Sequence, residues 1–223
     1  MAKETKKGAP ACGLYLRVAD DLPFETAMAQ IREAAFVINR SAYEKNMNVL
    51  EIGGSLDDEE GLLRMQALVE LARQLGVVAI VRNHAGLAFA AEADGVILEK
   101  IEDVEAARAV MGSDAIIGVR CGLSRLTAEK ALDVRVDYIS FAAGGRGDVL
   151  PPESLVGWWS VKSDTPCLIE GSLTNDDCGR YVRAGATFLE ASDYVWNHPK
   201  GIKQGTIDML YAIELAMESQ SVQ

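Results

Sequence analysis

Residues 166–177, PCLIEGSLTNDD, and residues 185–193, GATFLEASD, decide the fold, because each joins a short apolar run to a turn of small residues. Apolar runs of this length predict buried strands of a parallel sheet, here 167–169 and 187–190. Gly171 and Ser172 end the first strand, and Ser192 lies just past the second. Thr174 or Asn175 can cap a helix between them. In a β/α barrel the loops after strands seven and eight usually hold a phosphate. The prediction of a barrel therefore depends on whether six further strand–helix units precede this stretch.

Six further strands and their helices are predicted upstream of this stretch. The predicted strands cover 14–18, 47–52, 77–81, 95–98, 115–119 and 137–141. The predicted helices cover 24–38, 57–75, a short turn around 87–89, 103–111, 124–132, a segment opened by 151–153 and, after the eighth strand, 206–217. Eight strands that alternate with helices predict an α/β fold, a single (β/α)8 TIM barrel over residues 13–223. The rival, an open doubly wound sheet, is disfavoured because residues 17–20, RVAD, lack the glycine cluster that binds a dinucleotide.

The composition indicates a globular chain whose partner is neither nucleic acid nor a membrane. Apolar residues make up 49% and charged residues 25% of the sequence, which is typical of a domain with a packed core. The formal net charge of −11 opposes binding to nucleic acid or to an anionic membrane. The four cysteines show no zinc-ligand spacing, and residues 1–12, a predicted disordered tail, lack the apolar run of a signal peptide. We therefore expect a cytoplasmic protein that binds a phosphorylated small molecule. We also expect Trp158 and Trp159 to pack on the barrel or to form a homodimer contact.

Two segments rich in small residues are candidates for binding phosphate. Gly171, Ser172 and Ser192 stand at strand ends, where backbone N–H groups and hydroxyls can hold an anion. The alternative is that Gly171 and Ser172 only form a sharp turn and Ser192 only caps a helix. Gly144 and Gly145 belong to the loop after the sixth strand, where consecutive N–H groups can wrap an anion. The alternative for that loop is a surface connection without a ligand.

Charged residues near the predicted strand ends are candidates for catalysis or substrate binding. Arg146 supplies a cation in the glycine-rich loop. Glu170 ends the seventh strand, where it can act as a base or pair with Arg120 or Arg146. Arg120 can contact a phosphate, but we expect it to pair with Glu51, because opposite charges that face one barrel mouth neutralise each other. His84 can exchange a proton near neutral pH, yet without an identified partner the expectation is a structural role.

Several segments together resemble the family of thiamine phosphate synthases and thiazole tautomerases. Residues 14–16, LYL, resemble the opening strand of that family, and residues 93–98, ADGVIL, resemble its Ala-Asp-Gly-Val-His-Leu segment with Ile97 in place of His. Residues 117–119, IGV, and 136–139, VDYI, resemble two later strands. The resemblance covers about residues 14–200. It implies a barrel that joins a pyrimidine pyrophosphate to a thiazole phosphate with the help of Mg²⁺, and it implies that Gly171 and Ser192 bind the thiazole phosphate.

The positions that hold the pyrophosphate and the metal in this family are substituted here. The family's second strand ends in Gln-x-Arg-x-Lys, whereas residues 49–53 read VLEIG and place Glu51 where a cation belongs. By resemblance, Asn83 and His84 replace an Asn-Asp pair whose Asp binds metal, and imidazole is a poor ligand for Mg²⁺. Glu102 or Asp103 marks the second metal position. A Ser/His pair and a Lys in two later loops also lack counterparts.

Three functions stay open on the sequence. The resemblance favours a thiamine phosphate synthase-like transferase that binds a phosphorylated thiazole, with Glu51, Asn83 and Arg120 in the substrate pocket. A second interpretation is a non-catalytic or regulatory paralogue that keeps the phosphate pocket and has a degenerate pyrophosphate and Mg²⁺ site. A third is a different phosphate-ester barrel enzyme whose likeness is architectural only.

Overall fold

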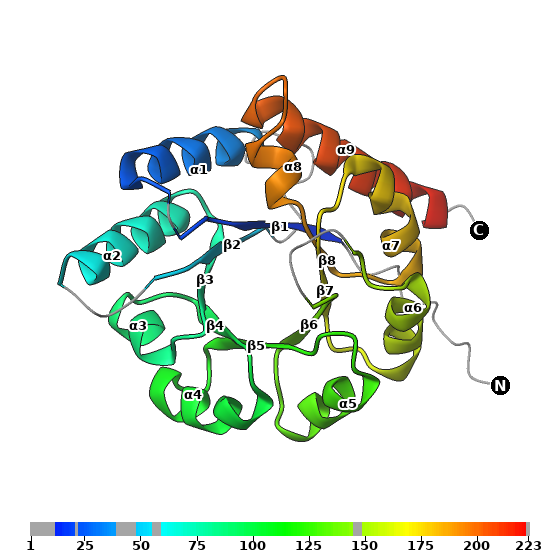
Figure 1. Ribbon diagram of the computed structural model, residues 1–223, viewed down its shortest axis with the longest axis horizontal. Helices are drawn as coiled ribbons and strands as arrows, with labels where there is room; N and C mark the ends of the chain where they lie inside the picture. Colours follow the sequence, from blue (N-terminus) through cyan, green and yellow to red (C-terminus); the bar gives the residue numbers. More distant parts are fainter. Residues whose placement is uncertain (1–11, 21, 39–47, 55–58, 145–148, 222–223) are drawn as a thin grey trace.

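The computed structural model describes residues 12–20, 22–38, 48–54, 59–144 and 149–221. Their strands close into a parallel barrel in which each strand pairs with the next one in the sequence and β8 pairs with β1 (Figure 1). The strands are β1 (Gly13–Arg17), β2 (Val49–Ile52), β3 (Val78–Arg82), β4 (Gly95–Leu98), β5 (Ile116–Arg120), β6 (Tyr138–Ala142), β7 (Cys167–Glu170) and β8 (Phe188–Glu190). The predicted (β/α)8 TIM barrel is confirmed, and each of the eight predicted strands is present.

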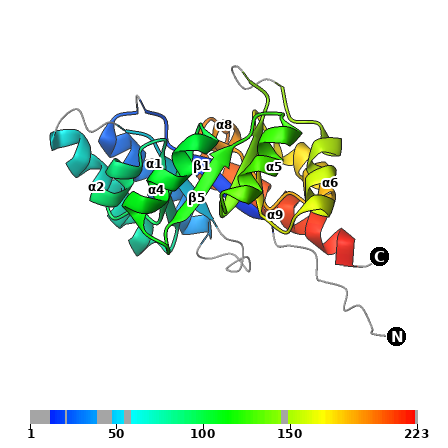
Figure 2. The same ribbon diagram turned by 90° about the horizontal axis from the view of Figure 1, so that it is seen from below.

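The helices form a ring outside the barrel (Figure 1), and the view turned by 90° shows α4 and α5 on either side of β5 (Figure 2). They are α1 (Phe24–Ile38), α2 (Glu59–Gln74), α3 (Ala85–Ala90), α4 (Val104–Met111), α5 (Arg125–Asp133), α6 (Glu153–Lys162), α7 (Cys178–Ala184), α8 (Ser192–Trp196) and α9 (Ile202–Ser221), with 3-10 turns η1 (Ile101–Asp103) and η2 (Asn175–Asp177). Within the described ranges, no helix has the length and apolar character needed to cross a membrane.

Three predictions near the chain ends need correction. The five-residue helix α8 follows β8 directly; a helix capped by Ser192 was one alternative, but its range was not predicted, because so short a helix shows no helical period. Helix α9 begins at Ile202 rather than at 206. Its first turn was not predicted, because Gly205 lowers the helix propensity there. Cys12, assigned to the tail, is fully buried because it packs into the hydrophobic core beside β1. Residues 1–11, the rest of the predicted tail, lie outside the described residues.

Strict alternation along the strands divides the barrel into an apolar interior and a polar end. One side of each strand packs against the helices, and the other side faces inward. The interior is filled by Tyr15, Val49, Ile80, Ile97, Tyr138, Leu168 and Phe188. The polar layer lies further toward the carboxyl ends of the strands: Arg17, Glu51, Arg82, Glu99, Arg120, Ser140, Glu170 and Glu190. Because catalytic groups of such barrels sit at the carboxyl ends of the strands, the polar layer is where a site is expected.

Gly118 makes room for the ring of Tyr138 inside the barrel. The two residues are partners in the register of β5 and β6. A Cβ atom placed on Gly118 would lie 2.2 Å from Cζ of Tyr138, and the ring is buried. A larger residue at position 118 would therefore have to displace a packed aromatic ring below the polar layer.

We predict that Gly118→Ala lowers the free energy of unfolding by about 1–3 kcal/mol, because the added methyl group overlaps the ring of Tyr138. Gly157→Ala is the matched control. No atom lies within 4 Å of its Cβ position, and it stands inside α6, so the change should be neutral or stabilise by up to about 1 kcal/mol. Urea unfolding followed by circular dichroism measures both, and equal effects would contradict the packing argument.

Candidate functional site

Glu51 lies at the centre of the polar layer and is fully buried. Its carboxylate accepts hydrogen bonds from Nε of Arg82 at 2.5 Å and from Nη2 of Arg120 at 2.8 and 3.0 Å. The hydroxyl of Tyr15 donates a further bond at 2.8 Å, and Nε of Arg17 lies 3.2 Å from the same carboxylate. The predicted ion pair between Arg120 and Glu51 is therefore present, and it joins β5 to β2 across the barrel mouth.

The arginines keep Glu51 ionised in spite of its burial. Burial disfavours the charged form, but the guanidinium groups of Arg120, Arg17 and Arg82 outweigh it and lower the pKa of Glu51 to about 2. Burial likewise opposes the charge of Arg120, yet the two carboxylates beside it raise the pKa of Arg120 above its usual value. Glu51 and Arg120 are thus fixed as ions throughout the physiological pH range.

Glu170, the second carboxylate of the polar layer, extends the network to β7. Its side chain is buried and accepts a hydrogen bond from Nε of Arg120 at 2.9 Å. Nη2 of Arg17 and the hydroxyl of Ser140 also donate to it. The predicted pairing of Glu170 with Arg120 is therefore present. In this position the carboxylate is a counter-ion for two guanidinium groups, which opposes a role as a free base.

Two outer carboxylates bind one further guanidinium nitrogen each, on Arg120 and on Arg82. Nη1 of Arg120 lies 2.8 Å from Glu99, and Nη1 of Arg82 lies 2.8 Å from Asp20. Together with Glu51 and Glu170, four carboxylates share the three guanidinium groups of the polar layer. The layer therefore has no surplus positive charge among the described residues that could meet an incoming anion.

Glu190, on β8, makes a separate contact with Ser192, the first residue of α8. Oε1 of Glu190 accepts hydrogen bonds from the N–H of Ser192 at 2.9 Å and from its hydroxyl. The hydroxyl oxygen of Ser192 in turn accepts the N–H of Arg17 at 2.7 Å. Burial raises the pKa of Glu190, and Arg17 and Ser192 oppose this effect only in part. Ser192, predicted to bind phosphate or to cap a helix, thus donates both of its protons to a carboxylate of its own chain.

A cavity of about 250 Å³ opens beside the polar layer at the carboxyl ends of β1, β6, β7 and β8. It is lined by Arg17, Ala19, Ala142, Ala143, Glu170, Gly171, Glu190, Ser192, Asp193 and Trp196. Its position is the one at which β/α barrels hold phosphate. The cavity brings together three of the predicted site residues, Glu170, Gly171 and Ser192.

Gly171 shapes the wall of this cavity through its backbone. Its φ of +149° lies in a region that side chains rarely adopt, and a Cβ atom there would lie 2.6 Å from Cδ2 of Leu150. Among the described residues, none accepts a hydrogen bond from the N–H of Gly171 or of Ser172. Gly144 is exposed next to the cavity-lining Ala143. Gly145 and Arg146, also predicted to bind or act on an anion, lie outside the described residues.

Asn83 and His84 hold the loop after β3. Asn83 adopts a positive φ of 49°, and its side-chain oxygen accepts the N–H of Glu99 at 3.2 Å. Nδ1 of His84 accepts the N–H of Leu87 at 3.1 Å and so caps α3. The structural role expected for His84 is therefore present, and neither residue lines the cavity.

Glu102 and Asp103 do not form a metal site with other described residues. Both are exposed on the 3-10 turn η1, and neither takes part in the ion pairs of the polar layer. In the described part of the chain, no group of three or more His, Cys, Asp or Glu side chains is arranged to hold a metal ion. Mg²⁺ needs several hard oxygen donors at octahedral positions, so these residues do not fit the ion that the resemblance implies.

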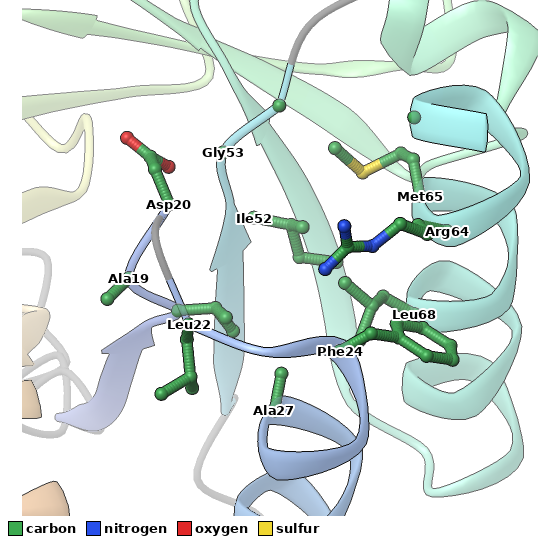
Figure 3. Close-up of a pocket in the computed structure, with 13 residues that line it drawn as sticks. Ala19, Asp20, Leu22, Phe24, Ala27, Ile52, Gly53, Arg64, Met65 and Leu68 are labelled. Atoms are coloured by element: carbon green, nitrogen blue, oxygen red, sulfur yellow. The ribbon is translucent and has the colours of Figure 1, made fainter. Parts of the chain in front are cut away.

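A second cavity, also of about 250 Å³, lies outside the barrel between α1 and α2 (Figure 3). Figure 3 shows Arg64 reaching from α2 toward Ile52 of β2, and the Arg64 Cζ atom lies 5.7 Å from the centroid of the Phe24 ring. No residue of the polar layer and none of the predicted site residues lines this cavity. The cavity at the carboxyl ends of the strands is therefore the candidate site.

Arg17 and Arg82 were not predicted from the sequence as site residues, although both pair with Glu51. A signal for them existed. Each stands two residues after an inward apolar residue, Tyr15 or Ile80, at the last position of a strand. Period-two alternation from a known inward residue predicts their direction.

The fold and the position of the cavity define a small single-barrel protein whose candidate ligand site lies at the carboxyl ends of its strands. The family profile of thiamine monophosphate synthase matches residues 20–189, and the chain belongs to this family. The thiamine-phosphate synthase of Rhodospirillum centenum is 32% identical over 150 residues, which cover 65% of this chain and 72% of that protein. The thiamine-phosphate synthase of Azoarcus sp. strain BH72 is 32% identical over 183 residues, 79% of this chain and 85% of the relative.

Solved structures support the fold independently. The thiamine phosphate pyrophosphorylase of Pyrococcus furiosus superimposes with a TM-score of 0.75 at 18% identity, covering 93% of this chain and 98% of that one. The orotidine 5'-phosphate decarboxylase of Pyrococcus horikoshii superimposes with a TM-score of 0.67 at 14% identity, over 90% and 99% of the two chains. At these identities the likeness concerns the barrel architecture alone.

We predict that Glu51→Gln lowers the free energy of unfolding by about 3–5 kcal/mol, because it removes the fully buried negative charge that three arginines share. Glu99→Gln is the matched control: it removes the same charge from a neighbour of Arg120, but its side chain is 49% exposed. That variant should lose less than about 1 kcal/mol. Chemical unfolding compares the two, and losses of similar size would remove Glu51 from the centre of the network.

The stability due to Glu51 should also depend on pH. Because its folded-state pKa of about 2 lies below the ordinary value of 4.5, ionised Glu51 stabilises the fold above about pH 4.5, and this contribution is lost as the pH falls toward 2. We expect the difference in unfolding free energy between wild type and Glu51→Gln to be constant above about pH 5 and to shrink below it. Urea titrations at a series of pH values give this difference. A difference that stays constant down to about pH 2.5 would show that Glu51 is not held by its arginines.

Proposed function

We propose that this protein acts in thiamine biosynthesis, in the cytoplasm, by binding a phosphorylated thiazole-type molecule without transferring a pyrimidine to it. The observation that carries this proposal is the cavity of about 250 Å³ beside Gly171 and Ser192, at the strand ends where barrels of this kind hold phosphate. Family membership supports the ligand class, since relatives that are about a third identical are named thiamine-phosphate synthases.

The phosphate would take its hydrogen bonds mainly from the β7 side of the cavity. The N–H groups of Gly171 and Ser172 have no acceptor among the described residues. The side chain of Arg17 is 31% exposed and lines the cavity, so its guanidinium can add a charge-assisted bond. Ser192 supplies its hydroxyl and N–H once they are released from Glu190. These groups are enough for a monoester and too few for a diphosphate.

The distribution of charge supports the loss of the transfer step. A diphosphate carries more negative charge than a monoester and needs several cations or a bound metal ion. Arg17, Arg82 and Arg120 already share four carboxylates, and Glu51 occupies the centre of the mouth. A diphosphate would have to displace a buried carboxylate from its counter-charges, which costs on the order of 3–5 kcal/mol.

Isothermal titration calorimetry with thiazole phosphate tests the binding. We expect the wild-type chain to bind it without Mg²⁺, and Ser192→Ala to bind about 10- to 100-fold more weakly, the effect of one charge-assisted hydrogen bond. Ser172→Ala is the control, because its hydroxyl does not line the cavity and its N–H is unchanged, so its affinity should stay within about threefold.

A product assay tests the absence of transfer. The chain is incubated with thiazole phosphate, the pyrimidine pyrophosphate and Mg²⁺, and thiamine phosphate is measured by fluorescence after oxidation. We expect no product above the level of the protein-free reaction. Product at an enzymatic rate would remove the non-catalytic part of the proposal, and absence of binding in the calorimeter would remove all of it.

A further inference from the structure

The contact between Glu190 and Ser192 points to a control on what the candidate site accepts. Oε1 of Glu190 takes both the N–H of Ser192, at 2.9 Å, and its hydroxyl proton. These are the same two donors that a phosphate at the end of β8 would use. A carboxylate of the chain therefore stands where a ligand oxygen has to be placed.

We propose that Glu190 is an internal anion that competes with the ligand phosphate for Ser192, and so determines which anions the site accepts. The inference rests on the proposed function, because it concerns the same cavity. A monoester gains the two donors of Ser192 only when the carboxylate of Glu190 has been protonated or has moved away. The more negative charge Glu190 retains, the more weakly the site binds a dianion.

Ser192 has no further proton to donate to a phosphate while its N–H and its hydroxyl are bonded to Glu190. The hydroxyl of Ser192 has one proton, which it gives to Glu190, and its oxygen already accepts the N–H of Arg17 at 2.7 Å. The N–H of Ser192 is a single donor as well. A phosphate oxygen that approached Ser192 while Glu190 stayed in place would meet no free proton from this residue.

Electrostatics act in the same direction. Glu190 is 6% exposed, and the charged groups that act on it are Arg17 on β1 and Glu170 on β7, whereas Asp193 on α8 lines the same cavity but is exposed to solvent. Arg17 also serves Glu51 and Glu170, so it cannot cancel Glu190 and a ligand together. At an effective dielectric constant of about 20, two unit charges roughly 4 Å apart repel enough to weaken binding by about a thousandfold.

Burial raises the pKa of Glu190, which supports the same conclusion. A carboxylate that is already reluctant to ionise takes up a proton more readily when a second anion approaches. We therefore expect binding of a dianion to be accompanied by uptake of a proton at Glu190, and to strengthen as the pH falls.

The test compares Glu190→Gln with Asp193→Asn in calorimetric titrations with thiazole phosphate. Glu190→Gln keeps the shape of the side chain and removes its charge, so we expect at least about tenfold tighter binding than wild type. Asp193→Asn is the matched control: it removes the same charge from the lining of the same cavity, but Asp193 does not hold Ser192. Its affinity should stay within about threefold of wild type.

Sulfate is the probe for the pH dependence, because its own charge does not change in this range. Wild type should bind sulfate more tightly as the pH falls from about 8 to about 5, and Glu190→Gln should show no such change. The wild-type titration needs no variant, so the proposal stays testable even where Glu190→Gln does not fold.

The outcomes separate this inference from the proposed function. Equal affinities of wild type and Glu190→Gln, with no pH dependence for sulfate, would overturn the role of Glu190 and leave the phosphate-binding function intact. Equal tightening by Glu190→Gln and Asp193→Asn would also overturn it, because the effect would then be one of overall charge. Absence of binding in all proteins would overturn both.

Discussion

The buried carboxylate of Glu51, held by three guanidinium groups, is the constraint on which the rest of the barrel mouth depends. An ionised carboxylate taken out of water costs several kcal/mol unless opposite charges and hydrogen bonds replace the water, roughly as much as the whole stability of a small domain. Arg17, Arg82 and Arg120 satisfy that requirement, and in doing so they are tied to a fixed place. The three cations of the mouth are therefore part of the packing, and each is already paired with carboxylates of the chain; of the three, Arg17 also lines the cavity. The candidate cavity lies on the side of the mouth formed by β1, β6, β7 and β8.

Fold and site depend on different residues of the same strands. A structure at 18% identity superimposes over 93% of the chain, so few identities are needed to specify the barrel. What specifies it is the alternation of buried residues with period two, together with helices that cover the outside. The chemistry of the mouth depends on a single layer, one residue from each strand, and a change of sign at Glu51 alters it without disturbing the alternation. A family fold can thus persist while the charge of its site is rearranged.

The sequence predicted the strands well because each is a short apolar run ended by small or charged residues. It also predicted the pairs of Arg120 with Glu51 and with Glu170, since opposite charges that face one barrel mouth attract. It did not identify Arg17 and Arg82, because the direction of a side chain at the end of a strand depends on register, which the sequence shows only after one inward residue is known. The bond between Glu190 and Ser192 was missed for a more local reason: it depends on the backbone turn that leads from β8 into a five-residue helix. Residues such as Asn83 and His84, placed by resemblance in a substrate or metal site, hold a loop and a helix end instead.

Glu51 and Glu190 show how the number of neighbouring cations decides the behaviour of one residue type in one layer. Both are buried glutamates at an inward strand end, so burial raises the pKa of each. Three guanidinium groups reverse this effect at Glu51, whose pKa is lowered, whereas Glu190 faces Arg17 and the donors of Ser192 and its pKa stays raised. Arg17 also forms ion pairs with Glu51 and Glu170. These two carboxylates therefore weaken the attraction of Arg17 for Glu190. Because Glu51 holds three cations on one side of the mouth, Glu190, on the other side, is the carboxylate whose charge is less firmly fixed.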